Sequence, residues 1–135
     1  MKITADTNVL VRAIVGDDKL QSAAAQDALA NADAIALTVP ALCELVWVLS
    51  RGYKIPRPEI AQTIRSLLNA ANIEVNRPAA EAGLEILEAG GDFADGVIAF
   101  EGEWLGADAF VSFDKKAVAL LERQGMPAHR YEVQG

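Results

Sequence analysis

Short apolar runs alternate along the chain with longer segments in which apolar residues recur every three or four positions. The short runs predict five strands, at Lys2–Ala5, Ala34–Leu37, Ile73–Val75, Ala109–Ser112 and, as a final edge strand, Ala128–Glu132. The longer segments predict seven helices, at Thr7–Val15, Leu20–Asn31, Pro40–Ser50, Pro58–Leu68, Ala79–Ala89, Phe93–Leu105 and Lys115–Arg123. Strands that alternate with helices in this way indicate an α/β fold with a mostly parallel sheet.

The segment Pro40–Ser50 is apolar on all sides except at Glu44, which predicts a buried helix with one carboxylate in it. A desolvated anion without a partner is costly. The residues three and four positions from Glu44 are apolar or proline, so none of them can pair with it. We expect Glu44 to bind a metal ion or to have a pKa shifted by neighbouring acids. A salt bridge to a distant arginine is the alternative.

Four further acids stand at the starts of predicted helices. Asp6 and Asp114 each follow a predicted strand, and Asp92 and Asp95 open the helix near Phe93. Aspartate is a favoured N-cap, and an acid three positions later suits the first turn, so capping alone explains these residues. Capping does not explain Glu44.

A parallel α/β fold offers a way for these acids to meet, because ligands bind outside the carboxyl ends of the strands. An oxygen-rich site selects hard cations such as Mg²⁺ or Mn²⁺. The chain has one histidine and one cysteine, which makes a zinc site improbable. If Asp6, Glu44, Asp95 and Asp114 converge in the fold, a divalent metal ion such as Mg²⁺ or Mn²⁺ is the simplest explanation of their placement.

Length and composition limit the other possibilities. A chain of 135 residues fits a single domain, residues 1–135. No apolar run approaches the roughly 18 residues of a membrane span, and a lone cysteine cannot form an internal disulfide. We expect a cytoplasmic protein without a membrane anchor. The net charge of −7 would repel phosphate at long range, so an enzyme acting on nucleic acid needs metal ions and a few local cations.

Taken in order, the motifs resemble those of the PIN domain. The matching segments carry the four acids and their neighbours: Ala5–Arg12, Glu44 within its apolar helix, Asp92–Ala99 and Ser112–Lys116. The resemblance covers about residues 2 to 131. It is closest to the VapC-like toxins of type II toxin–antitoxin pairs, which are small metal-dependent ribonucleases.

The resemblance implies a three-layer domain with a central, mostly parallel sheet of four to five strands flanked by helices. It also implies an endoribonuclease, a hydrolase that cuts RNA phosphodiesters by metal-activated water, with the four acids holding Mg²⁺ or Mn²⁺. A cognate antitoxin and a homodimer are the partners it implies. Residues close to the motifs are candidates for orienting the carboxylates or contacting RNA: Thr7, Asn8, Arg12, Asp92, Ser112, Lys115 and Lys116.

Other functions stay open at this point. Within the same family, the chain could be an RNA-processing nuclease rather than a toxin, or a non-catalytic domain that binds a partner. A haloacid-dehalogenase-like phosphatase would have a second aspartate where this chain has Asn8, and a receiver domain would have adjacent acids where it has Ala5 and Asp6. Both departures count against these two classes.

Overall fold

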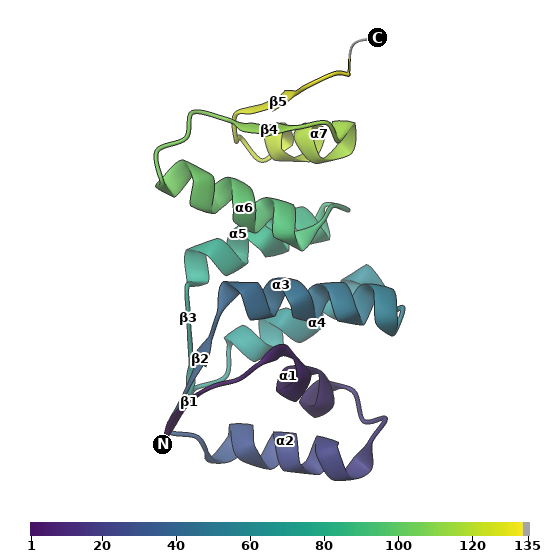
Figure 1. Cartoon of the computed structure of the whole chain (residues 1–135), viewed down its shortest axis with the longest axis vertical. Coiled ribbons are helices and arrows are strands. Elements are labelled where there is room, and N and C mark those ends of the chain that lie inside the picture. The colour runs from purple at the N-terminus through teal and green to yellow at the C-terminus, as the bar shows by residue number, and fades with distance from the viewer. Residues whose placement is uncertain (134–135) are drawn as a thin grey trace. The chain divides into compact units, whose positions relative to one another are not determined.

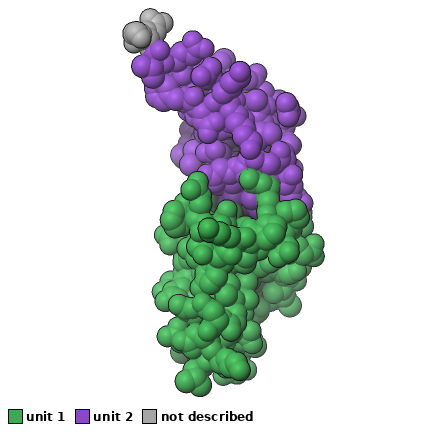
Figure 2. All heavy atoms as spheres, turned by 90° about the vertical axis from the view of Figure 1, so that its right-hand side faces the viewer, with its two compact units in different colours: residues 1–76 green, residues 77–135 purple. Residues whose placement is uncertain are grey.

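The computed structural model describes residues 1–133. The chain forms two compact units, an N-terminal unit of residues 1–76 and a C-terminal unit that begins at Arg77 (Figure 2). Among the described residues, no helix is both long and apolar enough to span a bilayer.

The N-terminal unit contains a parallel sheet of three strands in the order β1-β2-β3. The strands are β1 (Lys2–Thr4), β2 (Ala34–Leu37) and β3 (Ile73–Val75). Ile35 of the central strand β2 lies opposite Ile3 on one side and Ile73 on the other. The strands run side by side in Figure 1.

Four helices and a short π-helix complete this unit. They are α1 (Thr7–Ile14), α2 (Lys19–Asn31), α3 (Val39–Trp47), the π-helix η1 (Val48–Gly52) and α4 (Arg57–Leu68). Figure 1 shows α1 between α2 and α3, in agreement with its contacts to both helices. Leucine and isoleucine side chains of these helices form the core, and the most completely buried are Leu10, Leu42, Leu45, Leu49, Ile60 and Ile64.

Helix α3 is not buried on all sides, in contrast to the expectation from its composition. Glu44 is exposed, and so is Trp47, with 64% of its surface accessible. Leu42 and Leu45 on the same helix are fully buried. A single stripe of α3 therefore faces the core, while Glu44 lies on the opposite, exposed stripe. After Trp47 the chain continues in π-helical geometry to Gly52, a variation that is frequent near functional sites.

The C-terminal unit has three helices and a parallel pair of strands. Its elements are α5 (Arg77–Glu88), α6 (Phe93–Trp104), β4 (Phe110–Ser112), α7 (Lys115–Arg123) and β5 (Ala128–Arg130). Strand β4 pairs with β5 so that Phe110 lies opposite Ala128. The core lies where α5, α6 and α7 meet the strands, and it consists of Ile86, Ala99, Val118, Leu120, Leu121 and Ala128, with Phe110 and Met126 packed against it.

Helices α5 and α6 approach each other closely at two glycines. A Cβ added at Gly96 would lie 2.4 Å from the carbonyl oxygen of Ala82, and one at Gly83 would lie 2.7 Å from the Phe93 ring. Gly90 allows the sharp connection between the two helices, because its φ of 104° is disfavoured for residues with a side chain. This approach fixes the start of α6, where Asp92 and Asp95 lie.

The sequence-based prediction of an α/β fold with a parallel sheet is confirmed. Over residues 1–133, all five strands pair in parallel, in one sheet of three and one of two. The predicted helices and strands all occur, with small shifts at their ends. The largest difference is in the predicted helix Pro40–Ser50, which changes from α- to π-helical geometry after Trp47.

Replacing Gly96 by alanine should destabilise the protein, because the new methyl group would clash with the backbone of α5. We expect a loss of about 1–3 kcal/mol in the free energy of unfolding, measured by urea denaturation. Gly102→Ala is the matched control in the same helix, since the nearest atom to a Cβ there is 4.0 Å away. This control should be neutral or slightly stabilising. Equal stability of the two variants would contradict the close packing.

Candidate functional site

Asp6 links the end of β1 to the start of α1. Its backbone is extended, and its Oδ1 atom accepts a hydrogen bond of 2.9 Å from the backbone N–H of Val9, which makes it the N-cap of α1. The carboxylate is thus held at the positive end of the helix, while the residue as a whole is exposed. Over residues 1–133, its Oδ2 atom accepts no hydrogen bond from the protein, so one oxygen stays available for a ligand.

Glu44 is joined to the same turn of α1 through Thr7. The Thr7 hydroxyl donates a hydrogen bond of 3.0 Å to Oε2 of Glu44. Thr7 follows Asp6 directly in the chain, so this bond ties the Glu44 carboxylate to the residue next to the cap. The expectation that Glu44 is desolvated was wrong, since the residue is exposed and has a hydroxyl partner. Its position beside the α1 cap, rather than burial, makes it a candidate ligand.

The C-terminal unit contains the other three acids. Asp92 caps α6 by accepting a hydrogen bond of 2.9 Å from the N–H of Ala94, and Asp95 lies in the first turn of that helix. Asp114 caps α7, where its Oδ1 atom accepts hydrogen bonds from the N–H groups of Lys116 and Ala117. Ser112 supports this turn, because its hydroxyl oxygen accepts a hydrogen bond from the N–H of Asp114.

The charges of the other two acids affect the pKa of Asp95. Its partial burial, followed by the negative charges of Asp92 and Asp114, raises the pKa of the Asp95 carboxyl above its ordinary value. A carboxylate whose pKa is raised by neighbouring acids lies in a negative environment that a cation would stabilise. Unlike Asp6 and Asp114, Asp95 is not a cap, and no hydrogen bond from the protein to its carboxylate is seen among residues 1–133.

The donor chemistry of both units suits a hard divalent cation, because every candidate ligand is a carboxylate oxygen. In the N-terminal unit, Glu44 accepts a hydrogen bond from Thr7, the neighbour of Asp6, and in the C-terminal unit the charges of Asp92 and Asp114 act on Asp95. Over residues 1–133, no three or more histidine, cysteine, aspartate or glutamate side chains lie close enough together to hold a metal ion.

A groove of about 360 Å³ runs beside Asp6, between α1 and α2. Asn8 and Arg12, two of the residues predicted near the site, line it together with Asp6. On the α2 side the lining is formed by small or polar residues that the sequence did not mark as functional, namely Gln21, Ala24, Ala25 and Ala28. The groove gives a ligand a route along α1 to the Asp6 carboxylate.

Arg12 already has partners in the protein. Its Nη1 atom lies 2.9 Å from Oδ1 of Asp17, and the Tyr53 hydroxyl donates a hydrogen bond of 2.9 Å to Oδ2 of the same carboxylate. The bond from Tyr53, followed by the one from Arg12, lowers the pKa of the Asp17 carboxyl. This network connects the end of α1 with the residue that follows η1. It also pairs Arg12, which was a candidate for contacting RNA, with an acid of the protein itself.

Sequence spacing does not predict the Arg12–Asp17–Tyr53 network. Tyr53 is 36 positions from Asp17, so neither helical nor strand spacing relates them.

Lys115, by contrast, directly follows the Asp114 cap and is exposed, as the sequence suggested. It is the candidate cation nearest in sequence to one of the acids.

Comparison with known proteins identifies one family. The family model described as the PIN domain matches residues 3–121, which includes all four candidate ligands and extends over both units. No curated protein matches the chain.

The surroundings of Asp95 should make stability depend on pH. Because its pKa is raised in the folded protein, the folded state loses stability as the pH rises from the ordinary value of 3.8 through the raised value. Asp95→Asn removes this loss. We therefore expect the stability of the variant relative to the wild type to increase as the pH rises from about 4 to about 7.

Urea denaturation in EDTA at several pH values measures this difference. Glu101→Gln is the control, since it removes one negative charge from an exposed position of the same helix. If both variants gave the same pH dependence, the effect would come from net charge and not from the neighbours of Asp95.

Proposed function

The chain belongs to the PIN-domain family, whose members are generally nucleases, and from this membership we propose that it is a metal-dependent endoribonuclease. The family match runs through both units, which supports the prediction that residues 1–135 act as a single domain. In this proposal the substrate is RNA and the reaction is hydrolysis of a phosphodiester bond.

We propose that Asp6, Glu44, Asp95 and Asp114 together hold Mg²⁺ or Mn²⁺. The observation that carries this proposal is the PIN-domain match over residues 3–121, which includes all four acids. It is supported by the pKa of the Asp95 carboxyl, which is raised by partial burial and then by the charges of Asp92 and Asp114. A cation offsets such repulsion and favours the ionised carboxylates. Once bound, a divalent ion supplies Lewis-acid stabilisation for the charge that develops during phosphodiester hydrolysis.

The protein's own contribution is to fix the carboxylates before substrate arrives. The helix caps hold one oxygen of Asp6 and one of Asp114, and the Thr7 hydroxyl holds one oxygen of Glu44. Each bond reduces the freedom of a carboxylate while leaving its second oxygen available. In this role Thr7 orients Glu44 and Ser112 supports the turn of Asp114.

RNA binding by an acidic chain needs local cations and an open path. The groove beside Asp6, lined by Asn8 and Arg12, provides a path. Arg12 is partly neutralised by Asp17, so we assign the main contact with the RNA backbone to Lys115, beside Asp114. We propose that Asn8, which lines the groove, donates a hydrogen bond to a nucleotide there.

We further propose that the protein is the toxin of a type II toxin–antitoxin pair. The support is the order of the motifs and their resemblance to VapC-like proteins. In this proposal the toxin acts in the cytoplasm as a homodimer, and a cognate antitoxin holds it inactive.

Cleavage of a structured RNA such as transfer RNA tests the proposed activity. Wild-type protein should cleave it with Mg²⁺ or Mn²⁺ and not with EDTA. Asp6→Asn and Asp95→Asn should each lower the rate roughly 100-fold or more. Asparagine caps a helix about as well as aspartate, so Asp6→Asn should keep the fold.

Asp18→Asn is the matched control for Asp6→Asn. Asp18 caps α2 by accepting a hydrogen bond of 3.0 Å from the N–H of Gln21, in the same way as Asp6 caps α1. It is outside the proposed ligand set, so this variant should cleave at the wild-type rate. Metal-dependent cleavage that persists unchanged in both Asp6→Asn and Asp95→Asn would refute the proposed site.

A further inference from the structure

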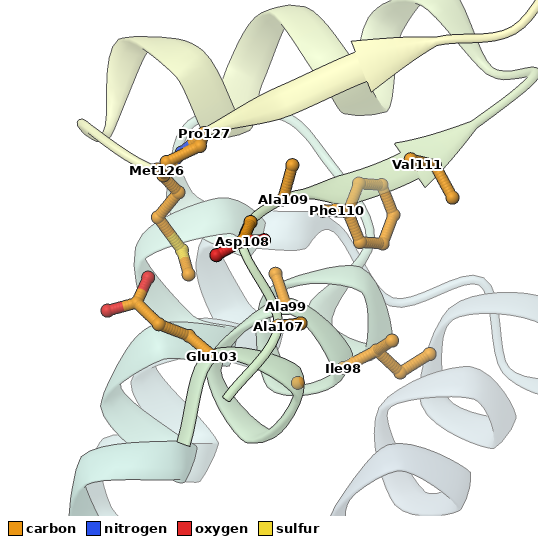
Figure 3. A pocket seen from close by; sticks show the side chains of 11 residues that line it. Ile98, Ala99, Glu103, Ala107, Asp108, Ala109, Phe110, Val111, Met126 and Pro127 are labelled. Atoms are coloured by element: carbon orange, nitrogen blue, oxygen red, sulfur yellow. The ribbon is translucent and has the colours of Figure 1, made fainter. Parts of the chain in front are cut away.

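A pocket of about 250 Å³ lies in the C-terminal unit, at the opposite end of α6 from Asp95. Its walls come from the last turns of α6, the segment that leads into β4 and the residues before β5 (Figure 3). The apolar part of the lining includes Phe110, Met126 and Pro127, and two carboxylates, Glu103 and Asp108, also line it. In Figure 3 the Met126 side chain extends toward α6, with Glu103 and Asp108 beside it.

Neither carboxylate of the pocket is paired within the protein. Over residues 1–133, Glu103 and Asp108 form no ion pair and their side chains make no hydrogen bond. Both residues are exposed, and so are Trp104 and Leu105, which follow Glu103 with 79% and 78% of their surfaces accessible. Trp104 and Leu105 thus present apolar surface beside two unpaired carboxylates. Exposed apolar surface of this kind, and tryptophan in particular, is typical of binding surfaces.

The charge of the chain is concentrated in the same unit. Of the 19 acidic residues, eleven lie in residues 77–135, whereas only five of the 12 lysines and arginines do. This distribution attracts a basic partner and repels phosphate. The same distribution opposes a symmetric contact through this surface between two copies of the chain, because two acidic surfaces would then face each other.

The size of the pocket limits what can enter it. A volume of about 250 Å³ is below the roughly 300–1,000 Å³ of small-molecule and cofactor sites. It suits a single long side chain. Lysine and arginine combine an aliphatic stem with a cationic end, which matches apolar walls that carry two carboxylates.

We propose that this pocket binds a lysine or arginine side chain from a basic, amphipathic segment of a partner protein. The aliphatic stem lies against Met126 and Phe110, and the cationic end pairs with Glu103 and Asp108. Apolar residues of the same segment contact Trp104 and Leu105. Met126 suits this role because its flexible thioether adapts to side chains of different shape.

Two double variants separate the pocket from bulk charge. Glu103→Gln with Asp108→Asn removes the two charges of the pocket. Glu101→Gln with Glu122→Gln removes two exposed charges of the same unit that do not line it. The probe is a fluorescent peptide of alternating leucine and arginine, and its affinity for the full chain is measured by anisotropy, with a leucine–glutamate peptide as the counter-probe.

We expect the wild type to bind the leucine–arginine peptide and not the leucine–glutamate peptide. The pocket variant should bind about tenfold more weakly, and the control variant should keep most of the affinity. Equal losses in the two double variants would overturn the proposal, because they would show attraction by net charge alone. Absence of binding by the wild type, or equal binding of both peptides, would overturn it as well.

A third variant tests the shape of the pocket without changing its charge. Gly102 lines the pocket, and the nearest atom to a Cβ there is 4.0 Å away, so Gly102→Leu places a side chain in the space. Leucine is also the better helix former. Circular dichroism should show an unchanged fold and anisotropy a loss of about tenfold in affinity. Wild-type affinity in a folded Gly102→Leu protein would mean that the pocket is not used.

Discussion

The N-terminus of a helix attracts a carboxylate, and the candidate site of this protein depends on that attraction. The first turn presents N–H groups without backbone partners and a partial positive charge. Asp6, Asp92 and Asp114 each satisfy such N–H groups where a strand or loop becomes a helix. A cap needs only one carboxylate oxygen, so the same residue can stabilise its helix and offer its second oxygen to a ligand.

Capping and metal binding are therefore compatible explanations of these aspartates. Capping does not explain Asp95 and Glu44, since neither accepts a cap hydrogen bond. Glu44 is held by Thr7, and Asp95 lies in the first turn of α6, where partial burial and the charges of Asp92 and Asp114 raise its pKa. Repulsion among the acids of the C-terminal unit is the electrostatic cost of this arrangement, and a cation removes it.

Much of the fold was predictable because it rests on local periodicity. The strand Ala34–Leu37 and the helix Lys115–Arg123 have the predicted bounds, since apolar spacing and turn residues determine both. The exposure of Glu44 was not predictable. An apolar composition shows that a helix packs against a core, but it does not show which stripe of a nearly uniform surface stays outside.

The sequence predicted where the candidate residues lie relative to the helices and strands, but not which side chains they contact. Sequence position placed Asp6 and Asp114 at strand ends, as the structure has them. Contacts between distant segments, such as Thr7 with Glu44 or Asp17 with Tyr53, depend on how helices pack and leave no spacing in the sequence. The pocket beside Glu103 is of the same kind, because three separate segments form it.

The proposed function depends on the binding of a divalent metal ion by Asp6, Glu44, Asp95 and Asp114. Titration of Mn²⁺ into the wild type, Asp6→Asn and Asp95→Asn, with free Mn²⁺ followed by electron paramagnetic resonance, tests it directly. We expect each single variant to lose the tightest binding of the wild type, since each removes one proposed ligand. Wild-type affinity for Mn²⁺ in either variant would contradict the claim.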